Sequence, residues 1–179
     1  MHPQAHQFVR RALADLAVAG AHIVELGSYD VNGTEQGLSV RELCASSASY
    51  TGVDMRKGPG VDLVKQAQDL NADDLAHPAD IVICMETLEH DNDPASIIDA
   101  AFRVLKPGGV LILTAAGEGR QPHGVDGGGV GDEWYQNIGR ADLKAWLADW
   151  MDVRIHEDHA AHDIYATAVK PKKVDKKAD

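Results

Sequence analysis

Short apolar runs alternate with amphipathic stretches along most of the chain. Residues 79–85 form a continuous apolar run of strand length, which is typical of a strand buried on both faces of a parallel sheet. Between Pro94 and Leu105, apolar residues recur about every 3.6 positions, which predicts a helix with one buried face. The same criteria predict strands at 23–26, 50–54, 61–64, 79–85, 110–114, 153–155 and 164–169, and helices at 4–19, 34–46, 94–105 and 140–150.

This alternation predicts an α/β protein with a doubly wound, mostly parallel, seven-stranded sheet. The length of 179 residues corresponds to about one domain, which we place at residues 1–170. A lysine-rich stretch, 171–179, is predicted to be a flexible tail. The Gly-rich, polar segment at about 115–139 is a long loop for a compact domain. Loops of this kind are usually lids, substrate-binding elements or disordered segments.

A glycine-containing turn follows the first predicted strand, beginning at Gly27 and closing at Gly33. In a doubly wound sheet, ligands bind at the carboxyl ends of the strands, where this turn lies. A dinucleotide requires G-x-G-x-x-G, so that the backbone can approach the pyrophosphate. Here Ser28, Tyr29 and Asp30 follow Gly27, and the carboxylate would repel a phosphate. The turn therefore fits a nucleoside with a cationic tail, with an ordinary tight turn as the alternative.

The run Val24–Gly33 resembles the first motif of class I S-adenosylmethionine (SAM) methyltransferases, usually written E-x-G-x-G-x-G. It departs from that motif, because only Gly27 and Gly33 are glycines here. The resemblance implies a Rossmann-like methyltransferase fold whose last strand is antiparallel. It also implies that SAM contacts Glu25, Gly27, Ser28, Tyr29 and Gly33.

An acidic residue ends the second predicted strand, about 20 residues beyond the turn. A carboxylate in this place can accept both hydroxyls of a ribose, although a helix cap or turn would also use one. Asp54 and Met55 match the family's second motif, which implies that Asp54 binds the ribose and Met55 packs on the adenine. In the next motif, Gln66 replaces the family's usual acid before Ala67, and its amide oxygen can still accept a hydrogen bond from adenine.

The most specific resemblance lies between Ile81 and Thr114. Its centre, Cys84-Met-Glu-Thr-Leu-Glu-His90, is similar to the quinone-biosynthesis O-methyltransferases. The resemblance adds Met85 and Glu86 to the predicted SAM site, with Glu86 facing the SAM amino group. His90 and, in the Gly-rich loop, His123 are candidate catalytic bases for an acceptor proton, since histidine titrates near neutral pH. The alternative for His90 is a helix cap or a contact to the ribose.

A divalent metal is a less favoured possibility, and we predict no metal site. If a helix has begun by Glu86, then Glu86, Glu89 and His90 lie on one face and could hold Mg²⁺ or Mn²⁺, with His123 as a fourth ligand. This spacing looks like that of metal-assisted quinone-biosynthesis and small-RNA 2′-O-methyltransferases. Many methyltransferases without metals carry a similar Leu-Glu-His, in which case Glu89 would be solvated.

Charge restricts the partners. The chain carries 17 Lys and Arg against 28 Asp and Glu, a net charge of −11, which disfavours nucleic acid. No apolar run reaches the length of a membrane span, and the N-terminus lacks a signal-peptide pattern, so we predict no membrane partner and a cytoplasmic location. Cys44 and Cys84 lie in apolar surroundings without C-x-x-C spacing, which predicts reduced thiols.

The predicted function is SAM-dependent transfer of a methyl group to an oxygen or nitrogen of a small-molecule acceptor. One alternative is a protein that binds SAM or its demethylated product without turnover. The other is an NAD-type oxidoreductase, which the missing glycines disfavour. Because the sequence offers no added substrate domain, the acceptor site must come from the Gly-rich lid, the N-terminal helix or a partner subunit, as in a homodimer. We expect the lid to be mobile without ligand and to order over the cleft when cofactor and acceptor bind.

Overall fold

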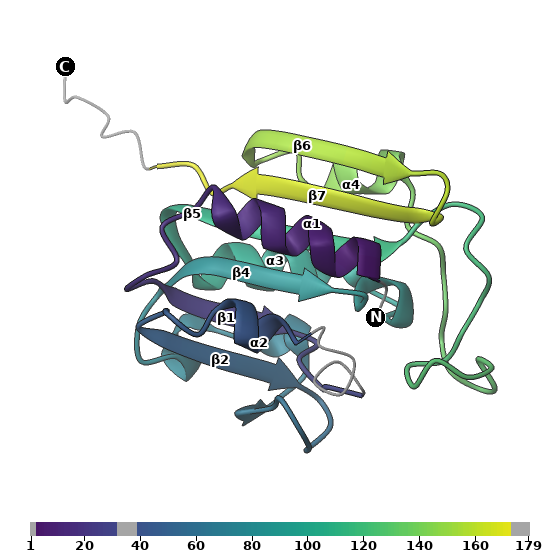
Figure 1. The fold of residues 1–179 in the computed structure, drawn as a ribbon, viewed down its shortest axis with the longest axis horizontal. Helices are drawn as coiled ribbons and strands as arrows, with labels where there is room; N and C mark the ends of the chain where they lie inside the picture. The colour runs from purple at the N-terminus through teal and green to yellow at the C-terminus, as the bar shows by residue number, and fades with distance from the viewer. Residues whose placement is uncertain (1–2, 32–38, 173–179) are drawn as a thin grey trace.

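The computed structural model describes residues 3–31 and 39–172, which form a seven-stranded sheet with helices on both faces (Figure 1). The strand order is β3-β2-β1-β4-β5-β7-β6. All neighbouring strands from β3 to β5 are parallel, and β7 is antiparallel to both β5 and β6. The strands are β1 (His22–Leu26), β2 (Ser49–Asp54), β3 (Leu63–Val64), β4 (Ala79–Met85), β5 (Leu105–Ala116), β6 (Met151–Asp158) and β7 (Asp163–Val169). The predicted doubly wound, mostly parallel sheet is confirmed.

The helices separate into two layers. α1 and α2 cover one face of the sheet, and α3 and α4 lie behind it in the same view (Figure 1). Three short 3₁₀ helices connect the strands within the described residues. The helices are α1 (Pro3–Ala14), α2 (Val40–Leu43), α3 (Pro94–Val104) and α4 (Arg140–Trp146), and the 3₁₀ helices are η1 (Ala67–Asp69), η2 (Ala72–Asp74) and η3 (Leu88–His90).

The apolar run of β4 packs into two cores because its side chains alternate between the faces of the sheet. Val82 and Cys84 join the core on the side of α3 and α4. Ile81, Ile83 and Met85 join the core under α1. A strand covered on both faces has no polar side, which explains the continuous apolar sequence.

Several elements end elsewhere than predicted. α1 ends at Ala14, although Leu16 beyond it still packs against the core. α4 ends at Trp146, and Trp150 remains buried in the turn that follows. β5 begins at Leu105, so that its first residues pair with β4 across a register shift. Gly33 and the rest of 32–38 lie outside the described residues, so α2 is the part of the helix predicted at 34–46 that the structure describes. Most of the predicted tail, residues 173–179, also lies outside the described residues.

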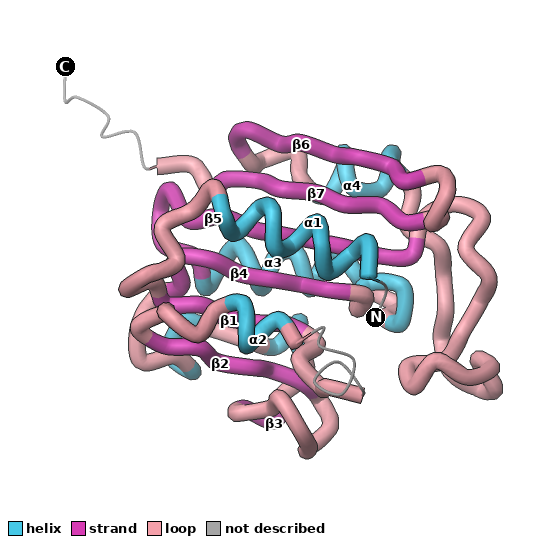
Figure 2. The backbone as a smooth tube through the Cα atoms, viewed as in Figure 1, coloured by secondary structure: helices cyan, strands magenta, loops and turns pink. Residues whose placement is uncertain are grey.

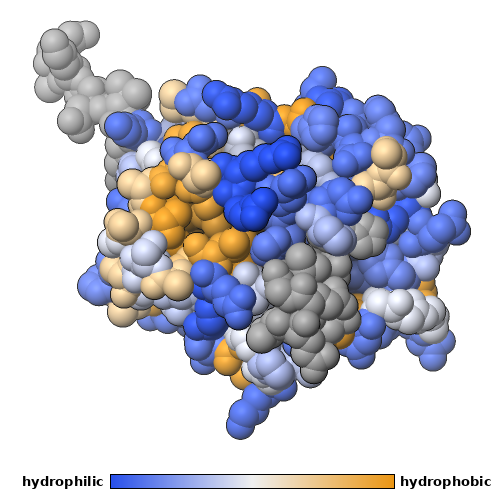
Figure 3. Space-filling model, viewed as in Figure 1, coloured by the Kyte–Doolittle hydropathy of each residue, from blue (hydrophilic) through white to orange (hydrophobic). Residues whose placement is uncertain are grey.

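The visible surface agrees with the charged composition. The face in Figure 3 is mostly hydrophilic, with an apolar region near the carboxyl end of α1. None of the helices in the described ranges combines the length and the apolar character needed to cross a membrane. Cys44 and Cys84 are both free and buried.

Candidate functional site

A cleft of about 840 Å³ opens at the carboxyl ends of β1, β2 and β4. One side is formed by the strand ends, and the other by residues of the long loop 117–139, which extends beyond these ends (Figure 2). His90 and His123 line it as well. The residues predicted for the cofactor that line this cleft are Glu25, Gly27, Ser28, Tyr29, Asp54, Met55, Gln66, Ala67, Met85 and Glu86.

Gly27 is required by its backbone conformation and by a close neighbour. Its φ is 76°, in the left-handed region that side chains other than glycine rarely adopt. A Cβ atom added there would lie 2.0 Å from the Oγ1 of Thr87. The N–H groups of Gly27 and Ser28 both donate to the carbonyl of Val53, at 2.9 and 3.1 Å. The turn is therefore held against the end of β2, where it leaves room for a ligand.

Asp54 is almost completely buried at the end of β2. Its Oδ2 accepts a hydrogen bond from the N–H of Tyr29 (3.2 Å), and its Oδ1 accepts one from the N–H of Arg56 (2.8 Å). The Arg56 guanidinium stacks on the Tyr29 ring, 4.1 Å from its centroid. The Asp54 carboxylate therefore holds two loops of the cleft together, which is the turn role given as an alternative to ribose binding. It also lines the cleft, where a ribose could reach it.

Glu25 is buried beneath the cleft. Its Oε2 accepts a short hydrogen bond, 2.5 Å, from the hydroxyl of Tyr50. Burial raises the pKa of Glu25 to about 7, and the Tyr50 hydrogen bond offsets only part of that effect. A cation in the cleft would favour the charged carboxylate.

The adenine side of the predicted site contains one exposed apolar side chain. Met55 is 67% exposed, while Ala67 is buried. The Oε1 of Gln66 accepts a hydrogen bond from the Nε2 of Gln68 at 3.0 Å, so it is an acceptor in this arrangement.

Glu86 does not lie in a helix, and the predicted helical spacing of Glu86, Glu89 and His90 is wrong. Its φ is 48°, and η3 begins two residues later at Leu88. The side chain turns towards β5, where its Oε1 accepts a hydrogen bond from the Oγ1 of Thr114 at 3.0 Å. Burial and then the nearby Asp163 raise the pKa of Glu86. Glu86 is therefore not a member of the group that Glu89 and His90 form.

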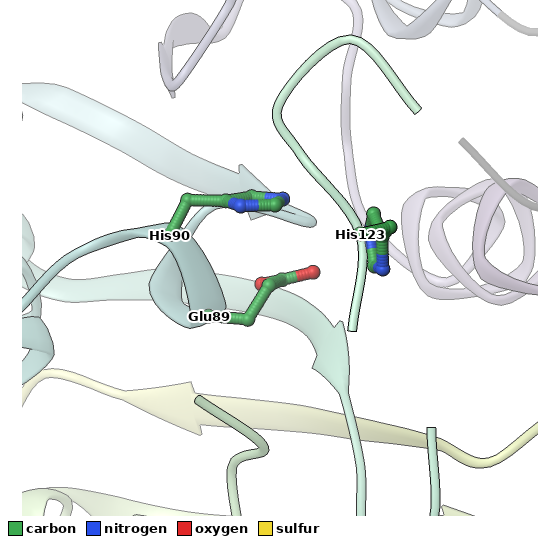
Figure 4. Close-up of side chains that lie close together, drawn as sticks. All are labelled: Glu89, His90 and His123. Atoms are coloured by element: carbon green, nitrogen blue, oxygen red, sulfur yellow. The ribbon is translucent and has the colours of Figure 1, made fainter. Parts of the chain in front are cut away.

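Instead, Glu89 and His90 meet His123 of the loop (Figure 4). One possible ligand atom from each of the three lies within 4.8 Å of the others. Glu89 is fully buried, so the alternative that it is solvated is wrong. Its Oε1 accepts a hydrogen bond from the N–H of Ala116 at 3.2 Å. Its Oε2 and the Nδ1 of His90 are buried without a hydrogen-bond partner.

The protonation of this group follows from its burial. Burial, followed by the charge of Glu86, raises the pKa of Glu89 well above its ordinary value. Burial, followed by the nearby His123, lowers the pKa of His90 to about 4, so that His90 is neutral at physiological pH. A neutral imidazole can accept a proton.

The same group fits a divalent cation. One carboxylate oxygen and two imidazole nitrogens are metal ligands, and two nitrogens favour a transition metal over Mg²⁺. His90 already has the neutral form that binding requires, and a cation would compensate the buried carboxylate of Glu89. Glu89, His90 and His123 are the one group of this kind found in the described residues.

Both ends of the loop 117–139 are held by the fold. At one end, Arg120 forms an ion pair with Asp163 of β7, with Nη1 2.6 Å from Oδ1. At the other, the N–H of Gln136 donates to the carbonyl of Glu89, and the N–H of Ile138 donates to that of Ala116. Between these ends, the loop carries His123 into the cleft. Sequence reasoning assigned no role to Arg120, because its buried partner is more than 40 residues away.

Comparison with known proteins agrees with this geometry. The methyltransferase domain family matches residues 4–162. The ubiquinone biosynthesis O-methyltransferase of Sodalis glossinidius is 38% identical over 95 residues, which cover 46% of this chain and 38% of that protein. Its counterpart in Pseudomonas syringae pv. syringae is 27% identical over 150 residues, which cover 74% of this chain and 60% of that protein. The matches thus leave a large part of these relatives uncovered.

Solved structures share the fold at low identity. The 1,6-didemethyltoxoflavin-N1-methyltransferase of Burkholderia thailandensis, solved with S-adenosylhomocysteine, superposes with a TM-score of 0.65 and 14% identity, over 94% of this chain and 79% of that one. The magnesium protoporphyrin IX methyltransferase of Synechocystis PCC 6803 has a TM-score of 0.62 and 17% identity, over 93% and 82%. With its motifs, its sheet and the family match over most of its length, this chain belongs to the methyltransferase domain family and has the class I SAM-dependent fold.

Proposed function

We propose that this protein transfers the methyl group of SAM to a hydroxyl oxygen of a small-molecule acceptor. The observation that carries the proposal is one cleft with two different sides. The residues expected to contact SAM lie at the strand ends, and His90 and His123 line the same cleft with the buried Glu89 beside them. No phosphate-binding glycine pattern is present for a dinucleotide, which argues against the oxidoreductase.

The cofactor roles follow from the polarity of each position. Asp54 accepts the ribose hydroxyls, and Met55 covers the adenine, which would remove its exposed apolar surface from water. Gln66 accepts a hydrogen bond from the adenine amino group. Glu25, which is buried, and Glu86, which is partly buried, both have raised pKa values and face the cationic end of SAM.

In the transfer, a lone pair of the acceptor oxygen attacks the methyl carbon, and the bond between that carbon and the sulfonium sulfur breaks. The sulfur keeps the bonding electrons, so SAM becomes the neutral thioether S-adenosylhomocysteine. The acceptor's proton leaves to a base. His90 is in place for this step because it lines the cleft. The positive charge of the imidazolium favours the ionised form of the adjacent Glu89, which then stabilises it. Holding the oxygen in line with the methyl group supplies most of the remaining rate.

Oxygen is favoured over nitrogen because the curated relatives carry the name O-methyltransferase. A divalent cation, where one binds, would be held by Glu89, His90 and His123 and would lower the pKa of the acceptor hydroxyl. Binding of Mn²⁺ can be followed by electron paramagnetic resonance without any activity assay. Loss of the bound signal in His123→Ala would support these ligands, and an absence of bound Mn²⁺ in the unaltered protein would remove them.

Titration calorimetry with SAM, S-adenosylhomocysteine and NAD tests the proposed function. We expect binding of the first two and none of NAD. A protein that binds NAD but not SAM would overturn the proposal. If SAM binds but radiolabelled SAM transfers no methyl group to any of a panel of small hydroxyl and amine compounds, the non-catalytic alternative gains.

A further inference from the structure

Three buried polar atoms without a hydrogen-bond partner belong to residues in one place. They are the hydroxyl of Tyr135, the Oε2 of Glu89 and the Nδ1 of His90. Buried polar atoms are nearly always paired in folded proteins. Their concentration beside the cleft indicates that a missing group completes them. Tyr135 is not among the predicted site residues.

The side chain of Tyr135 lies against both histidines. Its ring centroid is 5.7 Å from that of His90 and 5.0 Å from that of His123, and the histidine centroids are 5.1 Å apart. All three pairs have edge-to-face geometry. The next residue, Gln136, donates its N–H to the backbone carbonyl of Glu89 at 2.9 Å. Tyr135 is thus fixed by its ring and by its neighbouring backbone.

The chemistry of the unpaired atoms defines what can join them. The unprotonated nitrogen of a neutral imidazole accepts hydrogen bonds, whereas a phenol hydroxyl can donate one. These atoms make no hydrogen bond with one another or with any other described group. Tyr135 contacts His90 and His123, which line the cleft, although Tyr135 and Glu89 themselves lie behind that lining. An acceptor hydroxyl that enters past these histidines can donate its hydrogen to His90 and accept a hydrogen bond from Tyr135. Trp134, the adjacent residue, lines the cleft and offers an aromatic surface to the rest of the ligand.

We infer that Tyr135 binds the acceptor by donating a hydrogen bond to the oxygen that receives the methyl group. The inference rests on the proposed methyl transfer. A hydroxyl oxygen has two lone pairs, and the hydrogen bond from Tyr135 occupies one of them. The other is then directed at the methyl carbon while the proton leaves towards His90. Tyr135 therefore fixes the direction of attack.

The test removes only this hydroxyl. Tyr135→Phe in the full chain keeps the ring contacts with His90 and His123. With catechol as the probe acceptor and radiolabelled SAM, we expect kcat/KM for catechol to fall at least tenfold, with unchanged affinity for S-adenosylhomocysteine. Tyr165→Phe is the matched control, because its hydroxyl already donates to Asp163 in β7. Equal methylation of catechol by Tyr135→Phe and the unaltered protein would overturn the inference.

A second readout does not depend on turnover. The chain has four tyrosines, so 3-fluorotyrosine labelling gives few ¹⁹F resonances, and the one missing in Tyr135→Phe identifies Tyr135. Adding catechol to the complex with S-adenosylhomocysteine should shift the Tyr135 resonance and leave that of Tyr165 in place. An unshifted Tyr135 resonance at saturating catechol would overturn the inference. Failure of SAM to bind would overturn the proposed function instead, so the two failures are distinguishable.

Discussion

The two sides of the cleft are built in different ways. On the side that we propose binds SAM, here called the cofactor side, Gly27, Asp54 and Met85 stand at or beside the ends of strands that pair with one another, so their relative places follow from the sheet. On the side that we propose binds the acceptor, here called the acceptor side, Glu89 and His90 belong to a short 3₁₀ helix, and His123 belongs to a loop that begins beyond β5. The cofactor side is therefore fixed by backbone pairing, and the acceptor side by contacts between segments that are distant in sequence.

The charges differ as well. Glu25 and Asp54 are buried acids on the cofactor side. The Tyr50 hydroxyl donates to Glu25, and the N–H groups of Tyr29 and Arg56 donate to Asp54. Next to the acceptor side, Glu89 and Asp163 are buried, and Arg120 pairs with Asp163. Carboxylates gathered away from water raise one another's pKa values. The acceptor side is consequently the one whose electrostatics a bound ligand would change most.

The largest expected effect is on the cofactor side. Gly27→Ala places a Cβ 2.0 Å from the Oγ1 of Thr87 and forces alanine into a positive φ. We expect a loss of about 2–5 kcal/mol in the free energy of unfolding, from overpacking and backbone strain together. Urea denaturation measures it. Gly128→Ala is the control, because nothing lies within 4 Å of a Cβ there. Equal stability of the two variants would contradict a turn fixed by sterics.

Glu25→Gln should change how the stability of the protein depends on pH. Burial raises the pKa of Glu25 from 4.5 to about 7, so the folded state binds more protons than the unfolded state within that window. Its contribution to stability is therefore present below about pH 4.5 and is lost as pH rises through 7. Above pH 7 we expect Glu25→Gln to be more stable than the unaltered protein, by at most about 3 kcal/mol. Urea denaturation at pH 5 and pH 8 checks this, and a variant advantage that does not grow with pH would contradict it.

Asp54→Ala should weaken SAM binding by about 1–3 kcal/mol, the range for polar groups left unpaired. Titration calorimetry gives the value. Asp54→Asn is the matched control, since its amide oxygen can still accept the hydrogen bond from Tyr29 or Arg56. An unchanged affinity in Asp54→Ala would mean that the ribose is held elsewhere.

The smallest expected energetic effect lies at the loop tip. Asp126→Asn removes an ion pair in which Oδ1 lies 3.1 Å from the Nη1 of Arg56, and Asp126 is mostly exposed. We expect Asp126→Asn to lower the free energy of unfolding by less than about 1 kcal/mol, because exposed ion pairs are weak.

Hydrogen exchange tests the mobility of the loop in the unaltered protein. Exchange should be fast in 121–131 without ligand, and slower with S-adenosylhomocysteine and acceptor. Slow exchange of this segment in the free protein would contradict a lid.

Sequence patterns predicted the sheet, the Gly27 turn and the acid at the end of β2, because each is a local signal that parallel pairing places at a common edge. They could not predict how the loop returns to the site. The spacing of Glu86, Glu89 and His90 indicated a helical face, but the positive φ of Glu86 separates it from the other two. His123 came forward as a candidate on chemistry alone, since nothing local encodes its contact with His90. The burial of Glu89 likewise depends on residues about 25 to 45 positions further along the chain.

The two anchored ends of the loop have a consequence for protein engineering. Arg120 is held by Asp163, and Ile138 by Ala116, so both ends of the segment are attached to β-strands. The segment between these two attachments can therefore be replaced without changing where the loop begins and ends. Loops of other lengths and sequences inserted between residues 121 and 134 should change the acceptor preference, while the strand ends that we propose bind SAM stay as they are.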